Sequence, residues 1–304
     1  MSRLLIALLT ALLAAALAAC APAQPRPAGP AFALFGDAPY SQPHANLLDV
    51  LIDEMNAEPL EFAVHLGDIT SGTGPCSDEW LEARQHQFAR IRHPFVLVFG
   101  DNEWTDCHRS GLEPMERLGK LRVLFHSRDP QLPRFERQSR AYPEHTRWVA
   151  ADTLFVTLNV PGSNNNLGRT PDMDAEHASR MDAVFDWLDE AVSLAEAPDI
   201  TALVVLMHAN PHFEGASTRL RQADGYARLR HVLQSDARWL NKPLVVAHGD
   251  THRYKHDRPM REAPDLIRIE VDGWPALGWL VVRPNLSMRA GAGDPLSVER
   301  RLAH

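Results

Sequence analysis

Acidic and histidine side chains stand at the ends of five short apolar segments in this chain. Three segments end in Gly-Asp, one ends in His, and one ends in His-Gly-Asp-Thr-His. The side chains of interest are Asp37, Asp68, Asp101, His208, Asp250 and His252. A buried group of carboxylates is unfavourable unless a cation neutralises it. Carboxylate oxygens combined with imidazole nitrogens suit Mn, Fe or Zn. The pattern therefore predicts a transition-metal site.

The apolar segments that carry these residues have the character of buried strands in an α/β protein. They cover residues 31–35, 62–66, 95–99, 202–207 and 243–247. Helical patterns at 42–55, 78–92, 114–125, 174–196 and 225–240 separate or follow them, and a hairpin is expected within 148–160. Two further strands, 266–271 and 279–282, flank the turn signal at Asp272-Gly273. Because the carboxyl ends of parallel strands meet at one sheet edge, we expect the six side chains to gather there.

The order of these motifs resembles that of the calcineurin-like metallophosphoesterase superfamily over about residues 31–255. The matching segments are Gly36-Asp37-Ala38-Pro39, Gly67-Asp68, Gly100-Asp101-Asn102-Glu103, His208 and Gly249-Asp250-Thr251-His252. The resemblance implies an α/β fold, a four-layer α/β/β/α sandwich of the metallophosphoesterase type. It also implies metal-dependent hydrolysis of phosphate monoesters or diesters by a dinuclear centre that activates a bridging water.

The resemblance further implies a role for each ligand. Asp68 would bridge two divalent or trivalent ions, either Fe, Mn or Zn. Asp37 and His252 would complete the first ion's ligands, and Asp101, His208 and Asp250 those of the second. Glu103 would orient neighbouring ligands.

The sequence departs from the family pattern at the proton donor. Asn102 stands where the family has a histidine, and an amide cannot act as a general acid near neutral pH. Asn102 could still donate a hydrogen bond to a transition-state oxygen, and His212 or His248 could supply the proton. Two ligand positions also have alternatives, Asn102 for Asp101 and His248 for Asp250. Tyr40 is expected to be either a metal ligand or a packed wall residue.

Two residues are candidates for binding a small phosphorylated substrate. Arg109 could clamp a phosphate bidentately or form a surface ion pair. Asn165, within the run 164–166, could line the substrate cleft or belong to a plain turn. The alternative function is that of a catalytically impaired, metal-binding relative that acts as an envelope binding lipoprotein.

The first residues predict export. Residues 1–19 are expected to be a lipoprotein signal peptide, because Leu17-Ala18-Ala19-Cys20 resembles the bacterial lipobox. Cleavage before Cys20 would leave a lipid-anchored protein on the periplasmic side of the envelope, with the outer membrane as the default. A simple secretory signal is the alternative. Residues 20–30 form a Pro-rich tether, and residues 31–304 a single domain.

The remaining cysteines predict a disulfide, and the net charge bears on the kind of binding partner. Cys76 and Cys107 each follow a Gly-Asp strand end, which favours a disulfide in an oxidising compartment over two free thiols. The formal net charge of -8 argues against a nucleic-acid-binding surface.

Overall fold

The computed structural model describes residues 30–215, 223–285 and 295–303. The helices are α2 (Gln42–Ala57), α3 (Asp78–Phe88), η1 (Thr105–Ser110), α4 (Pro114–Phe125), α5 (Gly162–Asn165), α6 (Pro171–Ala195) and α7 (Ala227–Trp239). The strands are β1 (Ala31–Phe35), β2 (Leu60–His65), β3 (Phe95–Leu97), β4 (Glu136–Arg137), β5 (Thr146–Ala150), β6 (Thr153–Thr157), β7 (Ala202–Leu206), β8 (Leu244–His248), β9 (Lys255–Asp257), β10 (Leu266–Glu270), β11 (Gly278–Pro284) and β12 (Leu296–Leu302).

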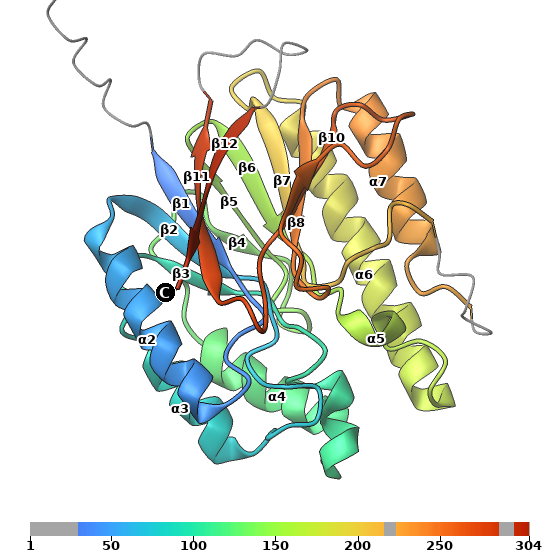
Figure 1. Cartoon of the computed structure of the whole chain (residues 1–304). Helices are drawn as coiled ribbons and strands as arrows, with labels where there is room; N and C mark the ends of the chain where they lie inside the picture. The colour runs from blue at the N-terminus through green and yellow to red at the C-terminus, as the bar shows by residue number, and fades with distance from the viewer. Residues whose placement is uncertain (1–29, 216–222, 286–294, 304) are drawn as a thin grey trace, which may run out of the picture.

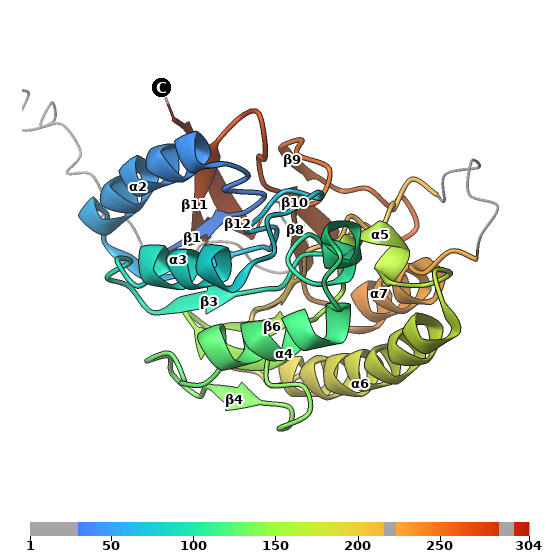
Figure 2. The same ribbon diagram turned by 90° about the horizontal axis from the view of Figure 1, so that it is seen from below.

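Two mixed sheets form the inner layers. One has the strand order β12-β11-β1-β2-β3, and the other has the order β4-β5-β6-β7-β8-β10-β9. β1, β2 and β3 run parallel, as do β6, β7, β8 and β10. Helices α2, α3 and α4 lie on one side of the sheets and α6 and α7 on the other (Figures 1 and 2). The predicted four-layer α/β/β/α sandwich is therefore confirmed.

Aromatic side chains fill the interface between the two sheets. Phe32 stacks on Phe62 with ring centroids 5.0 Å apart, and Trp148 stacks on Phe155 at 5.4 Å. Strand alternation directs the neighbouring residue Ala33 into the separate cluster beneath α2 and α3. The inner strands of each sheet are thus buried on both faces, which explains why β1 and β7 are apolar at every residue.

Several helices begin close to the predicted positions, and N-cap side chains mark the starts of two of them. Ser41 accepts a hydrogen bond from the His44 amide at the start of α2, and Ser77 caps α3 in the same way. The predicted helix 114–125 matches α4, and the expected hairpin forms from β5 and β6.

The structure differs from the expected elements in three respects. β3 ends at Leu97 rather than at residue 99. The strands β4, β9 and β12 were not expected. β10 and β11 belong to different sheets, so the turn at Asp272-Gly273 carries the chain from one sheet to the other.

A disulfide joins Cys76 in the loop after β2 to Cys107 in η1, with an S–S distance of 2.09 Å. The disulfide prediction is confirmed, and the alternative of two free thiols is excluded. The bond ties together two of the loops that follow predicted ligands.

The predicted signal peptide, Cys20 and the tether up to residue 29 lie outside the described residues. Lipidation and the division into signal, tether and single domain stay predictions. Within the described ranges, no helix combines the length and apolar character needed to span a bilayer.

Candidate metal centre

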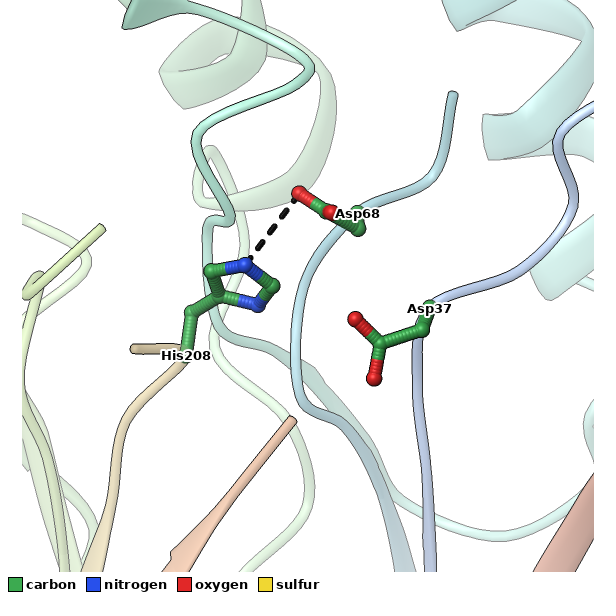
Figure 3. A group of neighbouring side chains, drawn as sticks. All are labelled: Asp37, Asp68 and His208. Carbon is green, nitrogen blue, oxygen red and sulfur yellow. Dashed lines mark ion pairs between the residues drawn. The ribbon is translucent and has the colours of Figure 1, made fainter. Parts of the chain in front are cut away.

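The predicted ligands gather at the carboxyl edge of both sheets. Asp37 and Asp68 follow β1 and β2 of the five-stranded sheet, whereas His208 follows β7 of the seven-stranded sheet. Figure 3 shows these three side chains converging from the two sheets. Asp101 follows β3, and Asp250 follows β8.

Two groups of three residues have the spacing of metal sites. Ligand atoms of Asp37, Asp68 and His208 lie within 4.8 Å of one another, and so do those of Asp101, His208 and Asp250. His208 Nε2 lies 3.3 Å from Asp68 Oδ1 and 3.0 Å from Asp101 Oδ1. The other ring nitrogen, Nδ1, lies 2.7 Å from the Leu66 carbonyl oxygen, which fixes the orientation of the ring.

Tyr40 and His252 extend the first group. The Tyr40 hydroxyl lies 3.1 Å from Asp68 Oδ2 and 2.9 Å from His252 Nε2. His252 Nε2 is in turn 3.6 Å from Asp37 Oδ1. Of the two alternatives for Tyr40, the structure places its oxygen among the candidate ligand atoms. Asp68 therefore has neighbours from both groups, with Oδ1 facing His208 and Oδ2 facing Tyr40.

The electrostatics of this cluster fit a cationic occupant. Burial raises the pKa of Asp37 to about 8 and raises that of Asp68 well above its usual range. Burial opposes protonation of His208, but Asp68, Asp101 and Asp37 together raise its pKa well above the ordinary value. Asp37 Oδ2 is buried and has no hydrogen-bond partner among the described residues. Bound cations would compensate this crowded negative charge, so the donor set suits the two ions that the resemblance implies.

Four residues at the candidate metal centre have a backbone conformation that is unusual for non-glycine residues. Asp37, Asp68, Asp250 and His252 have φ angles of 51°, 61°, 75° and 58°. These values lie in the left-handed region, where non-glycine residues are uncommon. The conformation turns each chain segment sharply at its strand end.

A glycine allows the close approach of two ligands. A Cβ atom on Gly162 would lie 2.5 Å from Asp101 Oδ1 and 2.8 Å from Asp250 Oδ1. No other residue fits this position without displacing a ligand of the second group.

Neighbouring side chains hold the ligands in place. As expected, Glu103 orients its neighbours, because Oε1 accepts hydrogen bonds from the Gly100 and Asp68 amides at 2.6 and 3.2 Å. Two supporting residues were not predicted from the sequence. The Ser163 hydroxyl donates to Asp101 Oδ2 at 2.8 Å, and the Asn210 amide donates to Asp250 Oδ2 at 2.9 Å. Both residues follow strand ends, but neither is ionisable. The pattern that predicted the ligands, an ionisable side chain at the end of an apolar strand, therefore did not identify them.

Asn102 and Asp101 have distinct roles. Asp101 lies beside His208 in the second group. The Asn102 side-chain amide instead donates to Asp68 Oδ2 at 2.6 Å and to the Thr70 carbonyl at 3.0 Å. The geometry thus favours Asp101 as the ligand and gives Asn102 contact with the central carboxylate.

The structure corrects the expectation for His248. This side chain is fully buried on the face of β8 that carries Leu244 and Val246, and its Nδ1 lies 2.9 Å from the Gly249 carbonyl. Burial lowers its pKa to about 3. His248 belongs to neither ligand group and has no exposed atom with which to protonate a substrate, whereas Asp250 does belong to the second group.

The structure also corrects the expectation for Asn165. Its side chain is fully buried, donates to the Gly225 carbonyl at 3.1 Å and accepts from Arg180 at 2.7 Å. Asn165 therefore supports a turn in which residues 163–166 all have positive φ angles. Its amide is not available to a substrate.

The remaining two predicted residues are partly exposed. The His212 ring packs edge-on against Tyr226 with centroids 6.1 Å apart. Arg109 forms an ion pair with Asp106 at 2.7 Å and keeps a side chain that is 46% exposed. Roles of His212 in proton transfer and of Arg109 in phosphate binding stay predictions.

Comparisons with known proteins support the architecture. No protein-family model and no curated protein matches the sequence. A solved structure of a dimetal phosphatase from Danio rerio is 15% identical, with a TM-score of 0.57, and the match covers 91% of this chain and all of that one (100%). The purple acid phosphatase PPD1 from yellow lupin is 12% identical, with a TM-score of 0.54, and the match covers 93% of this chain but 52% of that one. At such low identity the likeness establishes the arrangement of the chain in space, and this chain has the calcineurin-like metallophosphoesterase fold.

Proposed function

We propose that this protein hydrolyses phosphate esters with the help of two transition-metal ions. The observation that carries the proposal is the position of Asp68. Its Oδ1 lies 3.3 Å from His208, the residue common to both groups of ligand atoms, and its Oδ2 lies 3.1 Å from the Tyr40 hydroxyl. The similarity to structures named as a dimetal phosphatase and a purple acid phosphatase supports it.

The residues divide between two ions. Asp37, Tyr40 and His252 would hold the first ion, and Asp68 would be shared between the ions. Asp101, His208 and Asp250 would hold the second ion. When bound, such a pair supplies an acidified water and positive charge opposite the phosphoryl oxygens.

The protein's own residues set the geometry and limit the range of substrates. Asn102 donates to Asp68 and so restrains the shared carboxylate, and it has no proton of suitable acidity for a leaving group. We therefore propose that esters with good leaving groups react best, because these need little protonation.

The test is metal analysis followed by activity measurement on the purified mature chain. We expect two ions per chain by elemental analysis, and turnover of nitrophenyl phosphate mono- or diesters after loading with Mn, Fe or Zn. Asp68→Asn should abolish both, and asparagine tolerates the left-handed backbone at this position. Asp53→Asn is the matched control, because that carboxylate is exposed and pairs with Arg90 rather than with a candidate ligand.

One specific outcome favours the alternative function. Asn102 replaces an acid and contacts a ligand instead. A protein that holds two ions but turns over no ester in a broad panel would be a catalytically impaired metal-binding relative.

We also propose that the mature chain is anchored by a lipid at Cys20 on the periplasmic side of the envelope. The disulfide supports export, since such bonds persist in oxidising compartments. Labelled palmitate should enter the wild-type chain but not Cys20→Ala, and equal labelling of the two would exclude this anchor.

A further inference from the structure

A pocket of about 540 Å³ lies beside the candidate metal centre on the side of Asp101. Its volume is within the range of small-molecule sites. Ser163 links the two regions, because it lines the pocket and its hydroxyl donates to Asp101 Oδ2 at 2.8 Å. A ligand in this pocket would therefore lie next to a phosphoryl group held at the centre.

The pocket is cationic, although the whole chain carries a net charge of -8. Two arginines, Arg109 and Arg169, line it together with a single carboxylate, Asp106. Asp106 pairs with Arg109 at 2.7 Å. One guanidinium thus remains without a carboxylate partner in the pocket wall.

Arg169 is that unpaired guanidinium. In the part of the chain that the structure describes, it makes no ion pair, and its contacts are with neutral groups. It donates to the Thr105 carbonyl at 2.5 Å and to Asn166 Oδ1 at 3.1 Å, and it also contacts the His108 ring. The two hydrogen bonds to oxygen use two of its N–H groups, while a guanidinium has about five donors in total. Donors therefore remain for an anion.

The contacts also hold Arg169 in place before any ligand arrives. Thr105 and His108 belong to η1, while Asn166 follows the turn α5, so two separate segments fix the guanidinium. A fixed guanidinium loses little side-chain freedom when it binds an oxyanion, and it can bind one bidentately.

We propose that this pocket binds a second anionic group, a phosphate or a carboxylate, carried by the alcohol part of the ester substrate. The inference rests on the proposed function, because the first anion is the phosphate ester at the metal centre. It deepens that function by assigning a substrate class: phosphate esters with two separated anionic groups. Arg169 is the main recognition residue.

The kinetic test compares three esters that differ only at the far end of a short chain. These are propyl phosphate, 3-(phosphonooxy)propanoate and propane-1,3-diyl bisphosphate, assayed by phosphate release with the metal-loaded protein. All three have a poor alkoxide leaving group, so turnover should be slow for each and only the ratio of their kcat/KM values is compared. We expect kcat/KM for one or both of the doubly anionic esters to exceed that for propyl phosphate by about tenfold, as one charge-assisted hydrogen-bond pair provides. The carboxylate and bisphosphate arms show which anion fits.

Variants assign the preference to the pocket. Arg169→Gln should reduce the ratio of kcat/KM for the doubly anionic ester to kcat/KM for propyl phosphate by about tenfold. The change should appear mainly in KM, because the substitution removes an interaction that is equally strong in the ground state and the transition state. Arg90→Gln is the matched control. Arg90 is an exposed arginine outside the pocket lining that pairs with Asp53 at 2.9 Å and precedes β3, so the preference should be unchanged.

A binding measurement separates this inference from the proposed function. Propane-1,3-diyl bisphosphonate and propylphosphonate, which cannot be hydrolysed, are titrated into wild type and Arg169→Gln by calorimetry. We expect tighter binding of the bisphosphonate to wild type and equal binding of both to the variant. Equal binding to wild type, or an unchanged preference in the variant, would overturn the inference even if simple esters are hydrolysed. A bisphosphonate preference without any turnover would instead count against the proposed function alone.

Discussion

The hydroxyl of Tyr40 lies 2.9 Å from Nε2 of His252, although the two residues are far apart in the sequence. Their separation suits two ligands of one ion rather than a packed wall residue beside a ligand. We expect Fe³⁺-loaded wild type to show a visible tyrosinate-to-iron absorption band and Tyr40→Phe to lack it. An identical spectrum for Tyr40→Phe would exclude phenolate coordination.

Gly162→Ala should damage the second ion position selectively. The three atoms nearest to the added Cβ all belong to Asp101 and Asp250, two candidate ligands of the second ion. We expect elemental analysis to find about half the metal content of wild type, together with a loss of activity. Gly119→Ala is the control, because a Cβ at that position has no heavy atom within 4 Å. Full metal content in Gly162→Ala would contradict the assignment of Asp101 and Asp250 to one ion.

Glu103→Ala should weaken metal binding without removing a ligand. The substitution leaves the Gly100 and Asp68 amides without their buried acceptor. Loss of such an orienting partner typically reduces metal affinity by about 10- to 100-fold. Glu103→Gln retains an acceptor oxygen and should lose less. The affinity is measured by competition with a chelating dye, and equal affinities for Ala, Gln and wild type would rule out an orienting role.

Two buried histidines should make the fold sensitive to acid. Burial lowers the pKa of His126 and of His145 to about 4. Below the unfolded pKa of about 6.5, the unfolded chain binds more protons than the folded one, so stability falls as the pH decreases from about 6.5 towards 4. Each group contributes up to about 1.4 kcal/mol per pH unit in this window.

His126→Gln isolates this effect. Its free energy of unfolding, measured with urea at several pH values, should decrease less steeply below pH 6.5 than that of wild type. His231→Gln is the comparison, because His231 is exposed on α7. Parallel pH profiles for wild type and His126→Gln would refute the prediction.

The disulfide should contribute substantially to stability. Cys76 and Cys107 are separated by 31 residues, and closing a loop of that length stabilises a fold by about 3–4 kcal/mol on the loop-entropy model. The double variant Cys76→Ser/Cys107→Ser should therefore unfold at a lower urea concentration than wild type. Reductant should lower the midpoint of wild type but not that of the variant, and a midpoint that is the same in both proteins would contradict a stabilising bond.

The positions of the candidate ligands were predictable because the sequence signal is local. A buried strand that ends in Gly-Asp releases its carboxylate at the sheet edge, whichever strands lie beside it. Asp37, Asp68 and Asp101 all follow this rule. The orientation of His248 was not predictable in the same way. It shares a face with Leu244 and Val246, but both faces of β8 are apolar, so the sequence does not show which face meets the other sheet.

Sheet membership was not predictable for a related reason. The turn at Asp272-Gly273 has the same local chemistry whether it closes a hairpin or carries the chain between sheets. The edge strand β12 was missed because the polar run Glu299-Arg300-Arg301 interrupts its apolar residues, which gives a weak strand signal without its partner β11.

The left-handed backbone at Asp37, Asp68, Asp250 and His252 implies a trade-off between stability and activity. Residues in sparsely populated backbone regions cost of order 1–3 kcal/mol each, and the surrounding structure must compensate for that cost. Asp37→Gly removes the backbone strain together with a buried carboxylate oxygen, Oδ2, that has no hydrogen-bond partner among the described residues. Substitutions that relieve this strain would therefore stabilise the fold while they remove candidate metal ligands.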